Sequence, residues 1–184
     1  MSFKKITTPL SDKIVSNLKI GDKILLSGKI YSARDTAHNR LVKLIEKGES
    51  LPFDIDGQVI YFVGPTPARP GNPIGSAGPT TSSRMDAYSP GLMEIGLKGM
   101  IGKGGRSREV VDAMVKHGAV YFMAVGGAGA LISKCIKKSK VIAYEDLGPE
   151  AIMEMEVEDL PVIVINDIKG NDLYVEGVKK YKRQ

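Results

Sequence analysis

The stretch SREVVDAMVKHGAVYFMAV, residues 107–125, determines the class of fold. Residues 107–116 have the apolar spacing of a helix, in which the Ser107 hydroxyl can cap the first turn and Gly118 can end the last. Residues 119–125 then form an apolar run, which predicts a buried strand. A helix that leads directly into a buried strand is typical of mixed α/β proteins.

The sequence on the amino-terminal side repeats this alternation. Residues 36–47 have helical spacing and are followed by Gly48 as a stop signal. Residues 58–63 are a compact apolar run, rich in β-branched and aromatic side chains, that ends at Gly64-Pro65. A short strand is expected at residues 100–102, so strands and helices alternate through the middle of the chain.

Both ends of the chain are expected to add hairpin-like strands and short pieces. A strand interrupted by a turn is expected at residues 23–31, and a helix is expected from Gly126 through Lys138. Shorter segments are expected at residues 12–18 (amphipathic), 141–143 and 160–165 (strands), and 169–172 (a turn that leads into 173–175). The sequence therefore predicts an α/β fold with a mixed sheet and flanking helices, in a single domain of residues 1–184.

Composition limits the classes of protein to which the chain can belong. Of the 184 residues, 42% are hydrophobic and 26% are charged, which is ordinary for a folded, water-soluble domain. The amino terminus lacks an apolar core of signal-peptide length, and no stretch is long enough to span a membrane. A cytoplasmic protein without a membrane segment is expected. The single cysteine, Cys135, cannot form an internal disulfide or hold a metal or iron–sulfur site alone.

The formal net charge of +5 raises the question of nucleic acid. Lysines cluster in residues 134–140 and again in the tail 179–183, and both clusters are also compatible with ordinary solvated surface. No helix-turn-helix, zinc finger or aromatic RNA-binding signature accompanies them, and the few aromatic residues leave little for a stacking platform. Binding of nucleic acid is therefore not expected.

Two loops concentrate the groups that recognise small anions. Residues 64–90 are too rich in proline and glycine for long regular elements, and we interpret them as an ordered binding loop. This loop contains Gly78-Pro79-Thr80-Thr81-Ser82-Ser83-Arg84, and Gly102-Lys103-Gly104-Gly105-Arg106-Ser107 follows it. Free backbone N–H groups, short hydroxyl side chains and a planar guanidinium bind a carboxylate or a phosphate.

Arg34, Arg84 and Lys103 form the candidate binding group, because each lies in a turn or at the start of a helix among small residues. If the three cations converge on one pocket, they suit a dicarboxylate; the alternative is that they are scattered surface charges. Thr80 lies four residues before Arg84 and can orient a substrate or move a proton. Its hydroxyl is a poor base in water and needs nearby cations to favour the alkoxide.

The remaining motifs have weaker functional interpretations. Residues 126–130 follow a strand, but they lack the third glycine of a dinucleotide fingerprint, so tight packing at the turn is the better interpretation. Cys135 is expected to be a partly buried small hydrophobe, and His117 a residue at a helix end. His38 follows Arg34 by four residues, on one face of a helix start, and its role is left open between structure and function.

Five ordered motifs resemble one enzyme family. They are Ala33-Arg34-Asp35-Thr36-Ala37-His38, residues 76–86, Gly102-Lys103-Gly104-Gly105-Arg106-Ser107, Val125-Gly126-Gly127 and Val157-Glu158-Asp159-Leu160-Pro161. With them the chain resembles, from about residue 9 to residue 174, the β subunit of class I fumarate hydratase and L-tartrate dehydratase. It is equally similar to the C-terminal domain of single-chain class I fumarases.

The resemblance implies a swivelling β/β/α domain that closes over a partner, the α subunit, which carries a [4Fe–4S] cluster on three cysteines. The open iron of that cluster would act as a Lewis acid on the substrate hydroxyl. By motif, Arg34 and Arg84 would grip the substrate carboxylates, Lys103 would be the lysine of the glycine loop, and Thr80 would be the base that takes the C3 proton. The resemblance places no metal ligand on this chain.

The function expected from the resemblance is the reversible hydration of fumarate to (S)-malate by a hetero-oligomer, with this chain inactive alone. The isolated chain can instead form a homodimer. Gly105 replaces the asparagine common in single-chain fumarases, and this keeps the conversion of tartrate to oxaloacetate open as an alternative. A non-catalytic module for anion binding or assembly is the alternative of another class.

Overall fold

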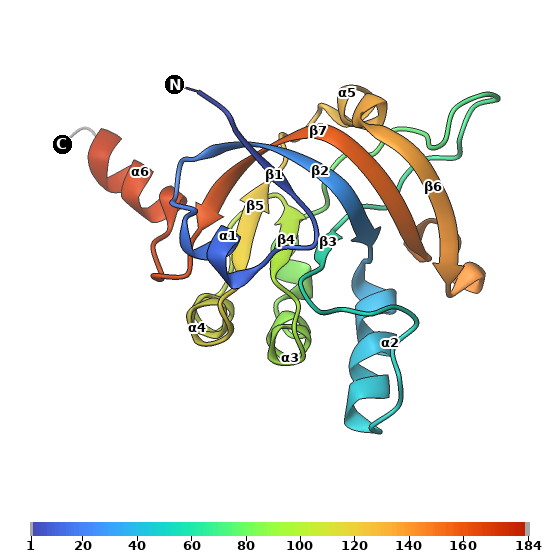
Figure 1. The fold of residues 1–184 in the computed structure, drawn as a ribbon, viewed down its shortest axis with the longest axis horizontal. Helices are drawn as coiled ribbons and strands as arrows, with labels where there is room; N and C mark the ends of the chain where they lie inside the picture. The colour runs from blue at the N-terminus through green and yellow to red at the C-terminus, as the bar shows by residue number, and fades with distance from the viewer. Residues whose placement is uncertain (1, 183–184) are drawn as a thin grey trace.

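The computed structural model describes residues 2–182 as a seven-stranded mixed sheet with helices on its faces (Figure 1). The strands are β1 (Lys4–Thr7), β2 (Lys23–Ser32), β3 (Val59–Tyr61), β4 (Gly99–Gly102), β5 (Val120–Met123), β6 (Ile136–Ala143) and β7 (Ile152–Asn166). The α-helices are α1 (Asp12–Ser16), α2 (Asp35–Glu46), α3 (Ser89–Glu94), α4 (Arg108–His117), α5 (Gly129–Ile132) and α6 (Leu173–Tyr181). Three 3₁₀ turns are η1 (Ser82–Met85), η2 (Ser133–Cys135) and η3 (Glu145–Glu150). The mixed α/β class predicted from the sequence is confirmed.

Strand β7 closes part of the sheet into a ring. The strand order is β1-β2-β3-β4-β5-β7-β6, with neighbouring strands from β1 to β5 parallel. β7 runs antiparallel to β5 and β6 and also pairs with β2 along most of its length. The strands β2, β3, β4, β5 and β7 therefore form a closed ring, from which β1 and β6 extend as edge strands.

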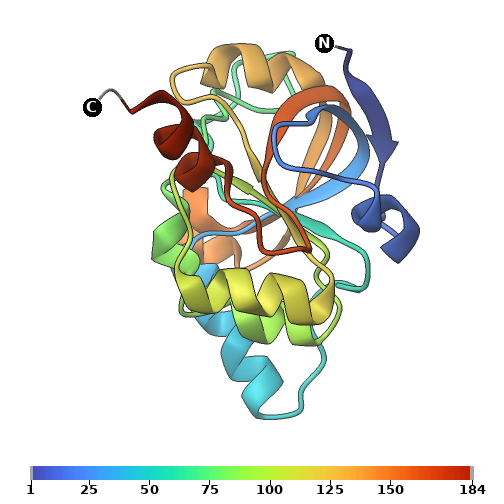
Figure 2. The ribbon, with the colours of Figure 1, turned by 90° about the vertical axis from the view of Figure 1, so that its left-hand side faces the viewer.

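Two cores lie on opposite sides of the ring because side chains alternate along each strand. Val59 and Tyr61 of β3 point into the inner core, whereas Ile60 points into the outer core. Helices α2, α3 and α4 cover the outer face, and they lie together below the sheet in Figures 1 and 2. Burying each large apolar side chain in these cores contributes about 1.5–3 kcal/mol.

Helix α4 has the caps that its sequence predicts. The Ser107 hydroxyl accepts a hydrogen bond from the Val110 amide at 3.4 Å, and Gly118 has φ 64° and ψ 50°. This left-handed conformation favours glycine. The boundaries of α2 and β5 also fall within two residues of those expected.

Two sequence predictions were wrong. The turn expected within residues 23–31 is a bulge in continuous β2, between Leu26 and Gly28. The helix expected from Gly126 through Lys138 stops at Ile132, and residues 136–143 form β6, because they pair with β7. The turn expected at residues 169–172 leads into helix α6, whose first turn is capped by the Asp172 carboxylate.

Strand β7 is also much longer than the expected segment of residues 160–165. Its first half is polar on one side, where glutamates face the lysines of β6, so it lacks the apolar run of a buried strand. Within residues 2–182, no helix is both long and apolar enough to cross a bilayer.

Candidate functional site

The candidate residues follow the carboxyl ends of neighbouring parallel strands. Ser32, the last residue of β2, lies beside Tyr61 of β3, which lies beside Ile101 of β4. The strands therefore end at the same edge of the sheet, with Arg34 just after β2 and Lys103 just after β4. Ligands of α/β proteins bind in the crevice outside such carboxyl ends.

The loop that carries Thr80 lies against the ends of β3 and β4 by main-chain hydrogen bonds. The Thr80 amide donates to the Phe62 carbonyl at 2.7 Å, and the Ser82 amide donates to the Lys103 carbonyl at 2.9 Å. In the opposite sense, the Lys103 amide donates to the Thr80 carbonyl at 3.2 Å. Thr80 and Lys103 are therefore held together by the backbone.

Hydroxyl groups beneath the loop fix the turn η1, which carries Arg84. The buried Ser82 hydroxyl lies 2.8 Å from the Tyr121 hydroxyl, which donates to the Gly104 carbonyl at 2.9 Å. A methyl group added to Gly102 would collide with the Ser82 hydroxyl, so this position requires glycine. The two loops of the site are therefore packed against each other through hydroxyls and a glycine.

Arg34 and Arg84 meet at one carboxylate, that of Asp35. Arg84 Nε donates to Asp35 Oδ1 at 2.7 Å, and Arg34 Nη2 lies 3.8 Å from Asp35 Oδ2. Arg34 Nη2 also lies 3.5 Å from Oε1 of Glu150, at the end of η3. The structure thus brings together two cations that lie fifty positions apart in the sequence.

The Lys103 side chain is exposed beside the glycine turn at residues 126–127. A methyl group added to Gly126 would lie 3.8 Å from Lys103 Cδ. The ion pairs found within residues 2–182 do not include one to Lys103. Its ammonium group therefore remains available for an anion.

Arg106 is a buried structural cation under the site. Its side chain is 0% exposed, and its Nε donates to Asp86 Oδ1 at 2.7 Å. The other carboxylate oxygen of Asp86 accepts from the Ser107 amide at 2.8 Å, and Arg106 Nη2 donates to the Ser89 hydroxyl at 2.7 Å. Burial lowers the pKa of Arg106, and the hydrogen bond to Asp86 opposes that shift. The pair ties the glycine loop to the segment that follows Arg84.

His38 supports Arg34 from inside the protein. The ring is buried, and its Nδ1 lies 2.9 Å from the Arg34 carbonyl oxygen, which fits a donated N–H. Burial lowers the pKa of His38 from 6.5 to about 4, so the ring is neutral at pH 7. The described residues provide no hydrogen-bond partner for its Nε2. This contact gives His38 a structural role behind the site.

Comparison with known proteins agrees with the motifs of the site. The sequence pattern of the family described as Fumarase C-terminus matches residues 4–177. The chain belongs to the fumarase C-terminus family. It is 41% identical over 168 residues to the anaerobic class I fumarate hydratase of Escherichia coli, covering 90% of this chain and 31% of that protein. It is 38% identical over 185 residues to a Methanocaldococcus jannaschii protein that carries the name L(+)-tartrate dehydratase subunit beta, covering 97% and 93% respectively.

The lengths of these relatives differ in an informative way. This fumarase C-terminus chain spans 28% of Leishmania major fumarate hydratase 2, to which it is 38% identical over 162 residues. It therefore corresponds to about a third of a fumarate hydratase chain, whereas it matches nearly the whole of the Methanocaldococcus jannaschii protein.

Class I fumarate hydratases are iron–sulfur enzymes, and the side chains of this fumarase C-terminus domain do not fit such a cluster. The full sequence has one cysteine, Cys135, and burial raises the pKa of its thiol. Within residues 2–182, no three His, Cys, Asp or Glu side chains are grouped closely enough to hold a metal ion.

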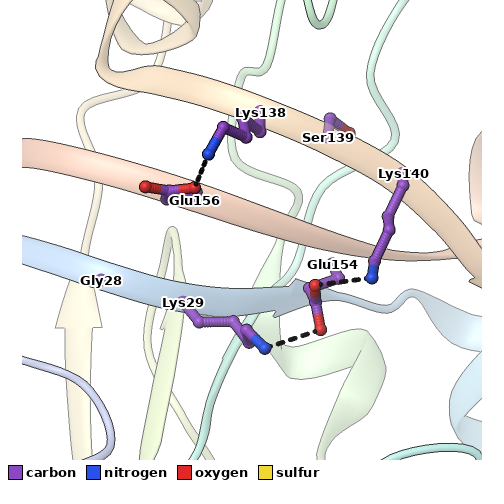
Figure 3. Close-up of a pocket in the computed structure, with 7 residues that line it drawn as sticks. All are labelled: Gly28, Lys29, Lys138, Ser139, Lys140, Glu154 and Glu156. Atoms are coloured by element: carbon purple, nitrogen blue, oxygen red, sulfur yellow. Dashed lines mark hydrogen bonds and ion pairs between the residues drawn. The ribbon is translucent and has the colours of Figure 1, made fainter.

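A separate hollow of the domain is lined by lysines and glutamates that pair with one another (Figure 3). Lys29 and Lys140 both pair with Glu154, at 3.1 and 3.0 Å, and Lys138 pairs with Glu156 at 2.8 Å. These pairs form a Lys–Glu ladder across β2, β7 and β6. The lysines at residues 137–140 are therefore solvated and paired, and none of the four candidate residues lines this hollow.

An apolar groove lies next to the glycine turn of the site. It runs past the end of β5, α5 and the amino-terminal segment, and its lining includes Phe3, Leu25, Met123, Val125, Leu131 and Ile163. Val125 is 54% exposed and Leu131 is 66% exposed. Val125 directly precedes Gly126, which lies against Lys103, so the groove and the candidate site are adjacent.

The sequence interpretation missed the residues that hold the candidate cations. Asp35 and Arg106 lie inside the quoted motifs, but their burial and partners were not apparent. Glu150 lies more than a hundred residues from Arg34 and carried no local signal. A carboxylate adjacent to a candidate arginine, as in Arg34-Asp35, is a sequence signal that could have indicated such a contact.

Proposed function

We propose that this chain is the β subunit of a cytoplasmic, two-subunit hydro-lyase that reversibly hydrates fumarate to (S)-malate. The observation that carries the proposal is the meeting of Arg34 and Arg84 at Asp35, on the edge of the sheet where Lys103 and Thr80 are bonded together. A four-carbon dicarboxylate has two anionic ends, and an edge with three cations can bind both. Family membership and the names of the relatives support the same reaction.

In this proposal the chain binds the substrate and moves one proton. Arg34, Arg84 and Lys103 neutralise the two carboxylates, which also lowers the cost of the negative charge that develops when C3 loses its proton. Thr80 accepts the C3 proton when malate is dehydrated and returns it when fumarate is hydrated. The hydroxyl at C2 leaves with a proton from a group outside this chain, so that one water is released or consumed.

The partner in the proposal is an α subunit that carries the [4Fe–4S] cluster, since the side chains of this chain do not fit it. The Methanocaldococcus jannaschii relative, whose name calls it a subunit, supports a separate partner chain. The apolar groove beside Gly126 supports contact with such a partner on the face of the site, because half-exposed Val125 and Leu131 gain from being covered. We therefore place an apolar segment of the α subunit in the groove.

The conversion of L-tartrate to oxaloacetate is the second candidate reaction. The specific observation in its favour is the match along 93% of the Methanocaldococcus jannaschii protein named as a tartrate dehydratase subunit. Tartrate differs from malate by one hydroxyl, so the same three cations suit both substrates.

The deciding experiment compares the purified chain with the reconstituted, iron-loaded complex on fumarate, malate and L-tartrate. We expect turnover by the complex and none by the chain alone. Enzyme-like rates from the chain without partner or iron would contradict the proposal. A complex that turns over L-tartrate but neither fumarate nor malate would assign the second reaction.

A substitution separates catalysis from a role in binding or assembly alone. Arg84→Ala in the complex removes one of the substrate cations, and we expect a large loss of kcat/KM. Arg108→Ala is the control, because Arg108 pairs with Asp112 on the exposed surface of α4. Unchanged turnover by Arg84→Ala would favour a module that is not catalytic.

A further inference from the structure

Two arginine–aspartate pairs involve helix α2, and they differ in which nitrogens the aspartate uses. In the outer pair, both terminal nitrogens of Arg40 donate to the two carboxylate oxygens of Asp146, at 2.9 and 2.6 Å. In the site, Asp35 accepts from Nε of Arg84 at 2.7 Å. Asp146 therefore occupies both terminal nitrogens of Arg40, whereas Asp35 occupies only Nε of Arg84.

The terminal nitrogens of Arg84 remain open as a result. Neither of them hydrogen-bonds to another group within residues 2–182, and the Arg84 side chain is 52% exposed. A guanidinium held by its Nε keeps a fixed plane, with two parallel N–H groups at its end. This arrangement matches a carboxylate bidentately.

Arg34 lies between two carboxylates at ion-pair distance, without the short Nε hydrogen bond that holds Arg84. Its Nη2 lies 3.5 Å from Glu150 Oε1 and 3.8 Å from Asp35 Oδ2. Glu150 is itself fixed, because its other oxygen accepts from the Thr36 amide at 3.2 Å. Among residues 2–182, Asp35, whose side chain is 26% exposed, is thus the one carboxylate that touches both arginines of the site.

We propose that Asp35 is a positioning residue: it holds Arg84 by Nε, beside Arg34, so that the terminal nitrogens of Arg84 face the substrate carboxylate. This role rests on the proposed function. Asp35 is also the first residue of helix α2, where its negative charge interacts favourably with the helix dipole and stabilises the helix. A test must therefore separate the orientation of Arg84 from the stability of α2.

The substitutions Asp35→Asn and Asp35→Ala make that separation. Both remove the negative charge from the first turn of α2, so a role in the helix dipole alone predicts similar losses of thermal stability and equal substrate affinity. Asparagine keeps an oxygen that can accept from Arg84 Nε, whereas alanine does not. Positioning therefore predicts that alanine weakens substrate binding more than asparagine does.

The measurement is the dissociation constant of fumarate for the assembled complex, with KM and kcat determined in parallel. For Asp35→Ala we expect fumarate affinity to fall about 10-fold and KM to rise equally, with a smaller fall in kcat, because the contact of Arg84 with a substrate carboxylate is made in the ground state and persists in the transition state. Asp35→Asn is expected to lie between alanine and the wild type. Asp146→Ala is the control, since it frees Arg40 outside the site, and it should leave both constants unchanged.

A second readout needs no substrate. In ¹⁵N-labelled chain, the Arg84 Nε–H resonance should be protected from exchange with water and lose that protection in Asp35→Ala. Equal fumarate affinity in the wild type and Asp35→Ala would overturn the positioning role, as would an unprotected Arg84 Nε–H in the wild-type chain. A wild-type complex that binds fumarate without hydrating it would overturn the proposed reaction and leave the positioning role standing. A complex that binds no dicarboxylate would overturn both.

Discussion

Thr80 and Lys103 are bonded main chain to main chain, with the Lys103 amide donating to the Thr80 carbonyl at 3.2 Å. The Ser82 amide returns a bond to the Lys103 carbonyl at 2.9 Å, so the loop continues the sheet past the ends of β3 and β4. The main-chain positions of the candidate base and of one candidate cation are thus fixed by backbone hydrogen bonds. Such preorganisation lowers the reorganisation needed during reaction.

Thr80→Val tests the hydroxyl with little change of shape. Because the loop is held by backbone bonds, we expect the thermal stability of the chain to be preserved while kcat of the complex falls by about 10²-fold or more. Steady-state kinetics on malate checks this. Thr7→Val on edge strand β1 is the matched control, and a Thr80→Val complex with normal kcat would remove Thr80 as the base.

Arg84→Lys tests the planar guanidinium. Lysine keeps the charge but cannot present two parallel N–H groups, so we expect KM for fumarate to rise about 10-fold. The matched control is Arg40→Lys, which breaks a two-point contact with Asp146 away from the site. Equal kinetics in the two variants would show that charge alone suffices at position 84.

Asp86→Asn tests the buried pair under the site. Arg106 would keep its charge in a place with no access to water, so we expect the free energy of unfolding to fall by about 3 kcal/mol. Urea denaturation of the isolated chain measures it. Asp112→Asn breaks the exposed pair with Arg108 and should cost about 0.5 kcal/mol or less. Similar losses in the two variants would contradict the structural role of Arg106.

His38 should make stability depend on pH. Burial lowers the pKa of His38 from 6.5 to about 4. Between these pH values the His38 ring is therefore protonated in the unfolded chain and neutral in the folded chain. The free energy of unfolding therefore falls as the pH is lowered through this window, by about 3 kcal/mol for this group, and the contribution is present in full above it. In His38→Asn this part of the slope should disappear. Parallel slopes for the two proteins, from urea denaturation between pH 7 and pH 4, would refute the assignment.

Leu131→Glu tests the apolar groove as the contact with the α subunit. A charge in a covered apolar contact is costly, so we expect assembly to weaken at least 10-fold, while the fold of the isolated chain is unaffected because Leu131 is 66% exposed there. Analytical ultracentrifugation of the two purified subunits measures assembly. Val178→Glu, on the exposed side of α6, is the control. If Leu131→Glu associates with the α subunit as strongly as the wild type does, the apolar groove is not the interface.

Local signals predicted the middle of the fold, and long-range pairing decided the parts that were wrong. Ser107 and Gly118 mark the two ends of α4 through their own backbone chemistry, so the sequence alone locates them. Residues 136–143 have no such markers, and they become a strand because they pair with β7. A bulge at Gly28 resembles a turn in the sequence, since both favour a glycine with positive φ.

In the candidate site, too, local motifs were predictable and long-range contacts were not. Arg34, Arg84, Lys103 and Thr80 lie in short motifs, and the structure joins Arg34 with Arg84 and Thr80 with Lys103, while their catalytic roles stay predictions. The groups that hold them were not predictable, because burial and a partner elsewhere in the chain give Glu150 and Arg106 their roles. The sequence shows which functional groups a segment carries, but it does not show which distant residues pack against them.

The Lys–Glu ladder has a consequence for how copies of this chain meet. Strand β6 lies at the margin of the sheet, where unpaired backbone groups can recruit a strand from another molecule. Lys137, Lys138 and Lys140 place positive charge along that margin, and Glu154, Glu156 and Glu158 hold the lysines in place from β7. Lysine side chains along an edge strand hinder its pairing with a further strand, so we expect the protein to resist edge-to-edge aggregation at β6.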